Sequence, residues 1–322
     1  MVACLLAILM VVSMVACGGD TTPENTLPDS GNNTPVDGGE TTDPVEDKGF
    51  EVTTATSGDF EISVLGAESV AGLGDAVALR IYYQFTNNSA FTAKALKDFS
   101  LAASQNGEEI GTVVPKDSVP EDNCNDLYVR PGATIRCTSV RKLVDETSPV
   151  TFTIGDLSAT EKLEVEFDLA NLPGAPAEAL EIAAVADPQN AGYAATEGTF
   201  DEKYAVKITG VEKTTDRKDN PTLVVHYSFT NNSNEDEGFI YAVGAKVFQD
   251  GIELQTTTPA DTNAPTYKAR TEDCPAGQTV EVDMYFKLIS DSPCEVEVCD
   301  KHITMDTDNY FEELIGLIFP VE

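Results

Sequence analysis

The stretch LRIYYQFTNNS at residues 79–89 decides the fold, because a close copy, LVVHYSFTNNS, recurs at residues 223–233. In each copy large apolar or aromatic residues occupy every second position as far as the phenylalanine. Alternation with period two places one set of side chains in a core and the other on the opposite face of a β-strand. The two stretches therefore predict two equivalent strands.

The shared pentapeptide FTNNS, at residues 85–89 and 229–233, is typical of a strand that leaves the core for a turn. Asn tolerates left-handed backbone angles, and Asn and Ser side chains hydrogen-bond to nearby backbone. We predict that Phe85 and Phe229 are buried and that the Asn side chains bond locally. Replacing Asn87 and Asn88 by Ala is then expected to cost about 1 kcal/mol. The functional alternative is N-glycosylation, because Asn-Asn-Ser is an acceptor sequon.

Further paired blocks extend the repeat over most of the chain. FEISVLGAESV (60–70) matches YAVKITGVEKT (204–214), and QNGEEI (105–110) matches QDGIEL (249–254), both at an offset of 144 residues. PGATIRCTSVRKLVDETSPV (131–150) matches PAGQTVEVDMYFKLISDSPC (275–294) with a one-residue shift. The chain is therefore a tandem duplication, with a period too long for a solenoid.

Turn signals between these blocks favour antiparallel strands. Asn106-Gly107 and Asp250-Gly251 suit two-residue type I′ hairpin turns, because both central positions of such a turn need positive φ. Ser-Pro at 148–149 and at 292–293 marks a second hairpin in each copy. Short strands with regularly spaced turns predict an all-β protein with two tandem antiparallel β-sandwich domains, at residues 50–170 and 202–322.

The N-terminus predicts export and lipid anchoring. Residues 3–16 form an apolar run that is too short for a membrane-spanning helix of about 20 residues and suits a secretory signal. Met14-Val15-Ala16-Cys17 resembles a bacterial lipobox, with Met in place of the usual Leu and with no Lys or Arg before the run. We expect residues 1–16 to be a signal peptide and Cys17 to carry fatty acid such as palmitate, which anchors the protein to the outer face of the cell membrane. The alternative is a simple secretion signal that is cleaved nearby. Glycosylation machinery is not expected for a bacterial lipoprotein, so the turn is the favoured interpretation of FTNNS.

Two segments have the composition of linkers. Residues 17–49 hold many acids and Thr-Pro or Asp-Pro steps but few aliphatic residues, so they cannot bury enough apolar surface to fold. We expect a disordered acidic tether there. The segment 171–201 is rich in Ala, Pro and Gly and is expected to be an interdomain linker, with a short helix at 177–186, that allows some relative motion of the domains.

The pattern V-x-Y-x-F-T-N-N-S, then Q-N-G or Q-D-G, then P-G and a late S-P turn, resembles domain of unknown function 5067. This domain is found, often in tandem, in lipoproteins of Gram-positive bacteria, and it is similar to the 4352 domain and to a secreted antigen with an immunoglobulin-like sandwich. The resemblance covers roughly residues 58–170 and 202–322. It implies an immunoglobulin-like fold and an extracytoplasmic location, and it brings no established activity.

The sequence offers little catalytic chemistry. The two histidines, His226 and His302, stand in no recognisable catalytic or metal motif, and no phosphate-binding or dinucleotide-binding loop is present. His226 lies on the outward-alternating side of its strand, which predicts a surface residue. We therefore expect no enzymatic activity and no cofactor.

Cysteines and acidic turns provide the remaining candidate sites. In an exported protein Cys124, Cys137, Cys274, Cys294 and Cys299 are candidates for disulfides. Cys124 can pair with Cys137, whereas Cys294 and Cys299 lie on opposite faces of one strand, so that Cys274 is expected to pair with one of them. Asn232, Asn234 and Asp236 carry oxygen ligands suited to calcium, but the EF-hand spacing fails and a solvated acidic turn is favoured over a metal site.

Net charge limits the partners. With 55 acids against 20 bases the formal charge is -35, which disfavours nucleic acid and attracts cations or basic partners. Apart from the membrane, reached through the lipid, the expected partner is an unknown envelope or extracellular protein or a glycan. The expected function is that of a non-catalytic cell-surface lipoprotein for binding, adhesion or envelope scaffolding. The alternative is a solute- or cation-capturing accessory to an envelope enzyme or transporter.

Overall fold

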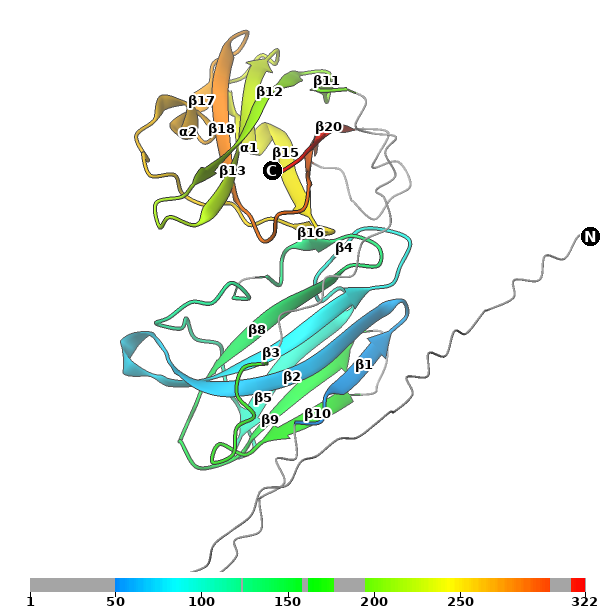
Figure 1. Cartoon of the computed structure of the whole chain (residues 1–322), viewed down its shortest axis with the longest axis vertical. Helices are drawn as coiled ribbons and strands as arrows, with labels where there is room; N and C mark the ends of the chain where they lie inside the picture. The colour runs from blue at the N-terminus through cyan, green and yellow to red at the C-terminus, as the bar shows by residue number, and fades with distance from the viewer. Residues whose placement is uncertain (1–49, 123, 158–161, 177–194, 302–313, 322) are drawn as a thin grey trace, which may run out of the picture. The chain divides into compact units, whose positions relative to one another are not determined.

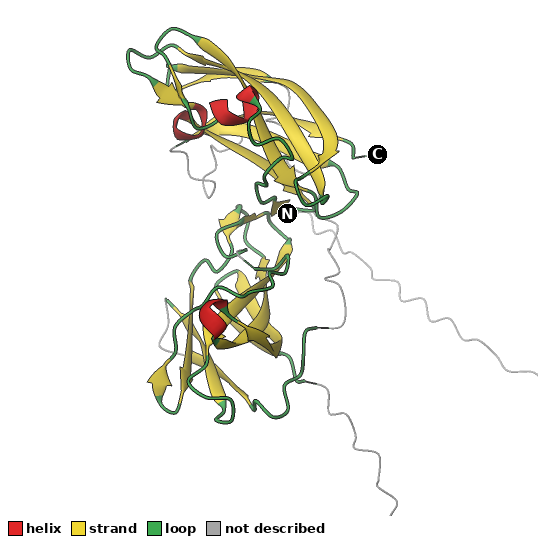
Figure 2. Cartoon of the chain, turned by 90° about the vertical axis from the view of Figure 1, so that its left-hand side faces the viewer, coloured by secondary structure: helices red, strands yellow, loops and turns green. Residues whose placement is uncertain are grey.

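The structure is a computed structural model that describes residues 50–122, 124–157, 162–176, 195–301 and 314–321 (Figure 1). Strands dominate these residues and helical turns are few and short (Figure 2). The predicted signal peptide and tether (1–49), the predicted helix at 177–186 and His302 lie outside the described residues. Among the described residues, no helix combines the length and the apolar character needed to cross a bilayer.

The first repeat forms two four-stranded antiparallel sheets. Their orders are β1-β2-β3-β8 and β10-β9-β5-β6, and β4 pairs with β7. A one-turn 3-10 helix, η1 (Leu73–Asp75), lies between β2 and β3. The strand bounds are β1 Thr53–Ser57, β2 Phe60–Ala71, β3 Val77–Asn87, β4 Ala93–Lys94, β5 Phe99–Gln105, β6 Glu108–Glu109, β7 Tyr128–Val129, β8 Thr134–Lys142, β9 Val150–Asp156 and β10 Lys162–Phe167.

The second repeat has an equivalent for every described strand of the first, so the duplication predicted from the sequence is confirmed. One sheet has the order β11-β12-β13-β18, and the other contains β20-β19-β15-β16. Short helices α1 (Phe239–Ala242) and α2 (Pro265–Ala269) are added. The strand bounds are β11 Glu197–Phe200, β12 Tyr204–Thr215, β13 Pro221–Asn231, β14 Glu237–Gly238, β15 Val243–Gln249, β16 Ile252–Glu253, β17 Asp273–Cys274, β18 Thr279–Lys287, β19 Cys294–Asp300 and β20 Leu314–Phe319.

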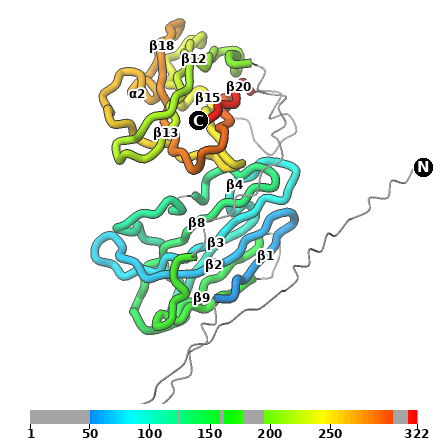
Figure 3. The backbone as a smooth tube through the Cα atoms, in the orientation of Figure 1, coloured from blue at the N-terminus to red at the C-terminus, as the bar shows by residue number. Residues whose placement is uncertain are grey.

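The prediction of an all-β, antiparallel fold is confirmed, and each repeat packs its two sheets around one core. In the first repeat Ile62 and Tyr83 from one sheet meet Phe152 and Val165 from the other. Side chains of this size stabilise the fold by about 2 kcal/mol each when buried. The adjacent course of β2, β3 and β8 can be followed in Figure 3. An immunoglobulin-like strand topology stays a prediction. Strand β11 begins at Glu197, within the segment expected to be linker.

Both long hairpins contain the same irregularity. The register shifts between Val64 and Gly66 in β2 and, at the equivalent point, between Ile208 and Gly210 in β12, as a β-bulge does. At Gly66 a Cβ atom would lie 2.6 Å from the carbonyl oxygen of Gly174. Glycine is therefore required there by the close approach of a second backbone segment.

The first FTNNS segment is a turn, as predicted, and Phe85 is completely buried before it. The Asn87 side-chain amide donates to the carbonyl oxygens of Phe91 (2.7 Å) and Val129 (2.8 Å). Its Oδ1 atom accepts the backbone N–H (3.0 Å) and the hydroxyl (2.6 Å) of Ser89. Because Asn87 is fully buried and its amide nitrogen is engaged, this side chain is not available as a glycan acceptor.

The second FTNNS segment repeats this arrangement bond for bond. Asn231 donates to the carbonyl oxygens of Glu235 and Cys274, both at 2.8 Å. Its Oδ1 atom accepts the backbone N–H and the hydroxyl of Ser233 at 3.0 and 2.7 Å. Phe229 is completely buried, as Phe85 is. The pentapeptide is therefore a turn that both copies retain at the same strand end.

A second buried amide in each repeat ties the β5–β6 or β15–β16 hairpin turn to the loop that leads from β8 to β9 or from β18 to β19. The strands that this loop joins lie in different sheets, so the second hairpin predicted at Ser148-Pro149 and Ser292-Pro293 is wrong. Gln105 is 1 % exposed and donates to the carbonyl oxygens of Asp145 and Ser148 while accepting the N–H of Val144. Gln249 makes the equivalent bonds with residues 289, 290 and 292. The following Asn106-Gly107 and Asp250-Gly251 pairs all have positive φ, which confirms the predicted type I′ turns.

Candidate functional site

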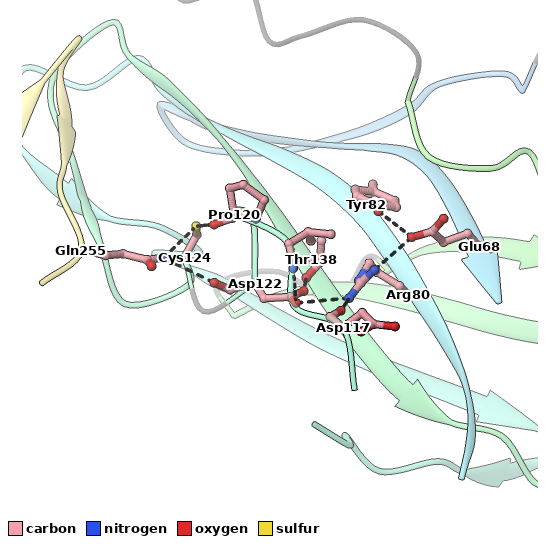
Figure 4. A network of polar contacts seen from close by, with 10 residues as sticks. Glu68, Arg80, Tyr82, Asp117, Pro120, Asp122, Cys124, Thr138 and Gln255 are labelled. Carbon is pink, nitrogen blue, oxygen red and sulfur yellow. Dashed lines mark hydrogen bonds and ion pairs between the residues drawn. The ribbon is translucent and has the colours of Figure 1, made fainter. Parts of the chain in front are cut away.

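A buried ion network lies on the outer face of the β1-β2-β3-β8 sheet in the first repeat (Figure 4). Arg80 is 3 % exposed although its strand position alternates outward. Its Nη1 atom lies 3.0 Å from Oε1 of Glu68, and its Nη2 atom lies 3.2 Å from Oδ2 of Asp122. Nη2 also donates to the backbone oxygen of Asp117, and the hydroxyl of Tyr82 donates to Glu68 at 2.7 Å.

The loop between β6 and β7 brings Asp122 onto this face and covers it. Thr138 of β8 donates its hydroxyl to Oδ1 of Asp122, and the backbone N–H of Val119 donates to Oδ2 at 3.0 Å. Backbone bonds from Val113 and Thr138 hold the same loop along the edge of β8. The network therefore joins the loop to the centre of the sheet.

In this network one cation, Arg80, is paired with two carboxylates. Burial alone would lower the pKa of Arg80, but the bond to Glu68 and the charge of Asp122 raise it above its ordinary value. Burial raises the pKa of Tyr82 to about 12, and the bond to Glu68 adds to the shift. Arg80 is thus a permanent cation between two carboxylates, and Tyr82 is a neutral donor. Such an arrangement holds a loop in place.

The equivalent face of the second repeat keeps the loop anchor and loses the central cation. The strand register makes Val224 the counterpart of Arg80 and His226 the counterpart of Tyr82. Asp283 replaces Thr138, and Thr266 from α2 donates its hydroxyl to Asp283. In the first repeat the carboxylate comes from the loop and the hydroxyl from the sheet. In the second repeat the carboxylate comes from the sheet and the hydroxyl from α2.

His226 is held by Asp283 on this face. Its Nδ1 atom lies 2.7 Å from Oδ1 of Asp283, and its Nε2 atom lies 3.9 Å from Oε1 of Glu212. The side chain is 34 % exposed, so it is partly at the surface, as its alternation indicated. Gly210 lies opposite in β12, where a Cβ atom would come within 3.3 Å of the imidazole ring.

The two cysteines of the first repeat lie in its core. Cys137 of β8 is completely buried, Cys124 is nearly so, and both belong to the core cluster of the first repeat. The Cys124 sulfur lies 3.4 Å from the carbonyl oxygen of Pro120 and 3.5 Å from Nε2 of Gln255 (Figure 4). The structure therefore places both cysteines of the predicted pair in one core.

The cysteines of the second repeat are distributed over two faces. Cys274 and Cys294 belong to its core. Cys299 follows Cys294 in β19 at an odd spacing, so its side chain lies on the opposite face of the strand. All five cysteines in the described part of the chain are thiols in the structure. The disulfide pairings therefore stay predictions.

Contacts among residues 48–322 group both repeats in one compact unit, and a second ion network joins them. The guanidinium group of Arg130, just after β7, pairs with Glu297 and, at 3.1 Å, with Glu295 of β19. It also stacks over the ring of Phe248, with its Cζ atom 3.9 Å from the centroid. Arg130 and Glu297 are both buried. The sequence repeat could not reveal this contact, because none of its residues recurs in the other copy.

Backbone pairing accompanies that ion network. Val129 of β7 pairs with Ile252 of β16, so β7 and β4 extend the second repeat's sheet to the order β20-β19-β15-β16-β7-β4. The backbone N–H of Tyr128 donates to the carboxylate of Glu253 at 3.0 Å. Strands from both repeats thus share one hydrogen-bonded sheet.

The acidic turn after β13 offers little as a cation site. Asn232, Asn234 and Asp236 are exposed there, and the carboxylate of Asp236 accepts the backbone N–H of Ala276 at 3.1 Å. Within the described ranges, no three His, Cys, Asp or Glu side chains gather as a metal site would require. Calcium binding at this turn stays a hypothesis that the structure does not test.

The fold and these networks define a tandem pair of all-β domains whose described buried charges hold loops and strands in place. The family model for the domain of unknown function DUF5067 matches residues 39–156 and 184–300, one match for each repeat. The chain belongs to this family, as the sequence pattern indicated.

Known proteins add little beyond the family. No curated protein matches the chain. Among solved structures, it is similar to a candidate lipoprotein, ycdA, of Bacillus subtilis subsp. subtilis str. 168, with 16 % identity and a TM-score of 0.30 over 39 % of this chain and 38 % of that one. It is also similar to a candidate lipoprotein of Staphylococcus aureus subsp. aureus NCTC 8325, with 12 % identity and a TM-score of 0.30 over 38 % of this chain and 96 % of that one.

Proposed function

We propose that the protein is a non-catalytic lipoprotein, anchored by Cys17 to the outer face of the cell membrane, whose repeats bind an envelope or extracellular protein or a glycan. One observation carries the non-catalytic part: the buried charged groups described above are engaged with each other. Arg80 lies between Glu68 and Asp122, and Arg130 pairs with Glu295 and Glu297. These bonds fix loops and strands and provide no activated nucleophile.

Divergence between the repeats supports a role in recognition. Both copies keep the same strands and the same buried turn amides, but the loop after β6 carries Asp122, which pairs with Arg80, whereas the loop after β16 carries α2. Loops on a rigid scaffold are where binding residues usually reside. With a net charge of -35, a partner surface rich in Lys or Arg is favoured.

The anchor is tested by labelling cells with a fatty acid that carries a chemical handle. The wild-type chain should incorporate the label and fractionate with membranes, and Cys17→Ser should abolish both. Cys4→Ser, at the other cysteine of the N-terminal segment, is the matched control and should label normally. A Cys17→Ser protein that stays labelled and membrane-bound would refute the proposal.

The binding role is tested by cross-linking on intact cells, followed by identification of the captured molecules. We expect capture of one basic protein or glycan-linked partner, weakened by salt because screening reduces the attraction between exposed charges. Titration calorimetry with calcium tests the alternative role in cation capture. Binding that is lost in Asp236→Asn, together with an absence of any captured partner, would favour that alternative.

A further inference from the structure

Exposed aliphatic side chains gather at one end of the first repeat, where the turn between β2 and β3 meets the loop between β6 and β7 (Figure 1). Leu73 is 58 % exposed, Val114 is 61 % exposed, and Ala71 is exposed beside them. Gly72 and Pro115 pair as an antiparallel bridge, which places Leu73 opposite Val114 on one face. Single exposed aliphatic residues are ordinary, but a group of them on one turn is a candidate interaction site. We call Ala71, Leu73 and Val114 the apolar tip.

Backbone hydrogen bonds hold the apolar tip in one conformation. The N–H of Leu73 donates to the carbonyl oxygen of Val114 at 2.9 Å, and the N–H of Lys116 donates to that of Ala71 at 2.8 Å. The ammonium group of Lys116 also lies 2.8 Å from Oδ1 of Asp75, across the same two segments. Because the surface is already ordered, a partner that binds it does not have to fix it first.

The second repeat builds the same frame with polar side chains. Arg217 and Thr258 occupy the positions of Leu73 and Val114, and the N–H of Arg217 donates to the carbonyl oxygen of Thr258 at 3.0 Å. The neighbouring antiparallel bridge, between residues 216 and 259, is also present. The fold therefore does not require aliphatic side chains at these two positions, and their exposure in the first repeat needs another reason.

The charges around the apolar tip are mainly negative. Residues 71–77 and 112–121 hold three acids, Asp75, Asp117 and Glu121, and one base, Lys116. Because Lys116 is already paired with Asp75, the edge of the apolar tip favours Lys or Arg side chains on a partner. A second copy of this chain, with its net charge of -35, and an anionic membrane surface have the same sign as this edge, so neither is favoured.

We propose that the apolar tip is the surface through which the protein binds a partner protein, and that this partner presents an apolar pocket edged by Lys or Arg side chains. The inference rests on the binding function proposed above and names its surface and the chemistry of its partner. Leu73 and Val114 supply the apolar centre of the contact, and Asp117 lies at its charged edge. The equivalent turn of the second repeat takes no part, because Arg217 would meet the partner's edge with a charge of the same sign.

Site-directed photo-cross-linking on intact cells locates the contact. Benzoylphenylalanine in place of Leu73 should capture one protein on irradiation, and the same probe in place of Arg217 is the matched control and should capture none. Mass spectrometry should place the cross-link on a partner peptide in which apolar residues are flanked by Lys or Arg. Equal capture at the two positions, or a cross-linked peptide without basic residues near it, would overturn the proposal.

Affinity then tests the chemistry of the contact with the captured partner after purification. Leu73→Arg combined with Val114→Thr gives the first repeat the side chains of the second, and this double variant should weaken binding about tenfold or more. Its urea midpoint should match that of the wild type, because both side chains are exposed. Arg217→Leu should leave the dissociation constant unchanged. A double variant that folds and binds as tightly as the wild type would contradict the proposal.

Further outcomes separate this inference from the binding function on which it rests. If general cross-linking on intact cells captures a partner equally with the wild type and the double variant, the apolar tip is the wrong surface while the binding function stands. If it captures nothing with either chain, both fail. Binding of Cys17→Ser protein to vesicles of phosphatidylglycerol and cardiolipin, or its self-association in solution, would also refute a protein partner at the apolar tip if the double variant abolished it.

Discussion

Asn87→Ala tests how the turn that both repeats share contributes to stability. The substitution removes two donors to main-chain oxygens, those of Phe91 and Val129, and the acceptor of the Ser89 N–H and hydroxyl. A hydrogen bond is worth about 1 kcal/mol net, and a buried partner left unsatisfied costs more. Ser89 is only partly buried, so water can replace part of its loss. We expect a total of about 3 kcal/mol, larger than a surface turn would give.

Urea denaturation followed by circular dichroism measures this change. With an m-value of about 1.5 kcal/mol/M, the midpoint of the first repeat's transition should fall by about 2 M. Asn88→Ala is the matched control, because its side chain is exposed, and it should change stability by less than about 0.5 kcal/mol. Asn231→Ala should lower the second repeat's transition by a similar amount.

Two results would refute this reasoning. If Asn87→Ala and Asn88→Ala cost the same, the buried amide does not carry the stability of the turn. If Asn87→Ala leaves the urea midpoint unchanged but abolishes capture of the partner, the segment is a recognition motif.

Three further predictions concern charged residues. Arg80→Met should destabilise the first repeat by about 3–5 kcal/mol in urea, because Asp122 is left as an unpaired buried charge; a loss below about 1 kcal/mol would contradict the network. Arg130→Met should lower the second repeat's transition although Arg130 belongs to the first, because Glu297 loses its partner, and an effect confined to the first repeat would disprove the joint. Burial alone would raise the pKa of Asp216, but bonds from Asn220, Thr257 and the backbone of Lys218 hold it well below its ordinary range. Its contribution should therefore be complete above about pH 5 and be lost as the pH falls below about 4, where melting curves of the wild type and Asp216→Asn should converge.

Local sequence signals predicted the frame of both repeats because the relevant interactions are short-range. Alternation around Tyr83 and Tyr227 placed the core, and Asn-Gly and Asp-Gly placed the hairpin turns. The repeated Gln105 and Gln249 carried a further signal, since a type I′ turn does not itself require glutamine before it. Their recurrence at the same offset could have indicated that both glutamines are buried and hydrogen-bond to a second loop.

The ion networks could not be predicted in the same way. Arg80 alternates outward, and only the fold of a loop some 40 residues later in the chain buries it with Asp122. Arg130 and Glu297 are separated by 167 residues, and neither recurs in the other copy, so the comparison of repeats gave no signal. In both cases a tertiary contact, not a local preference, determines the environment of the charge.

The contacts that Arg130 and β7 make with the second repeat fix the order of the two repeats along the chain. The halves of this joint are complementary rather than identical: β7 and Arg130 come from the first repeat, and β16, Glu295 and Glu297 come from the second. In the second repeat Pro275 follows β17 where Arg130 follows β7, and in the first Thr151 and Thr153 occupy the places of the two glutamates. Proline brings neither a charge nor a backbone N–H to this position. A third repeat added at either end would therefore find no matching surface, and exchanging the two repeats within the gene would separate the halves of the joint instead of rebuilding it.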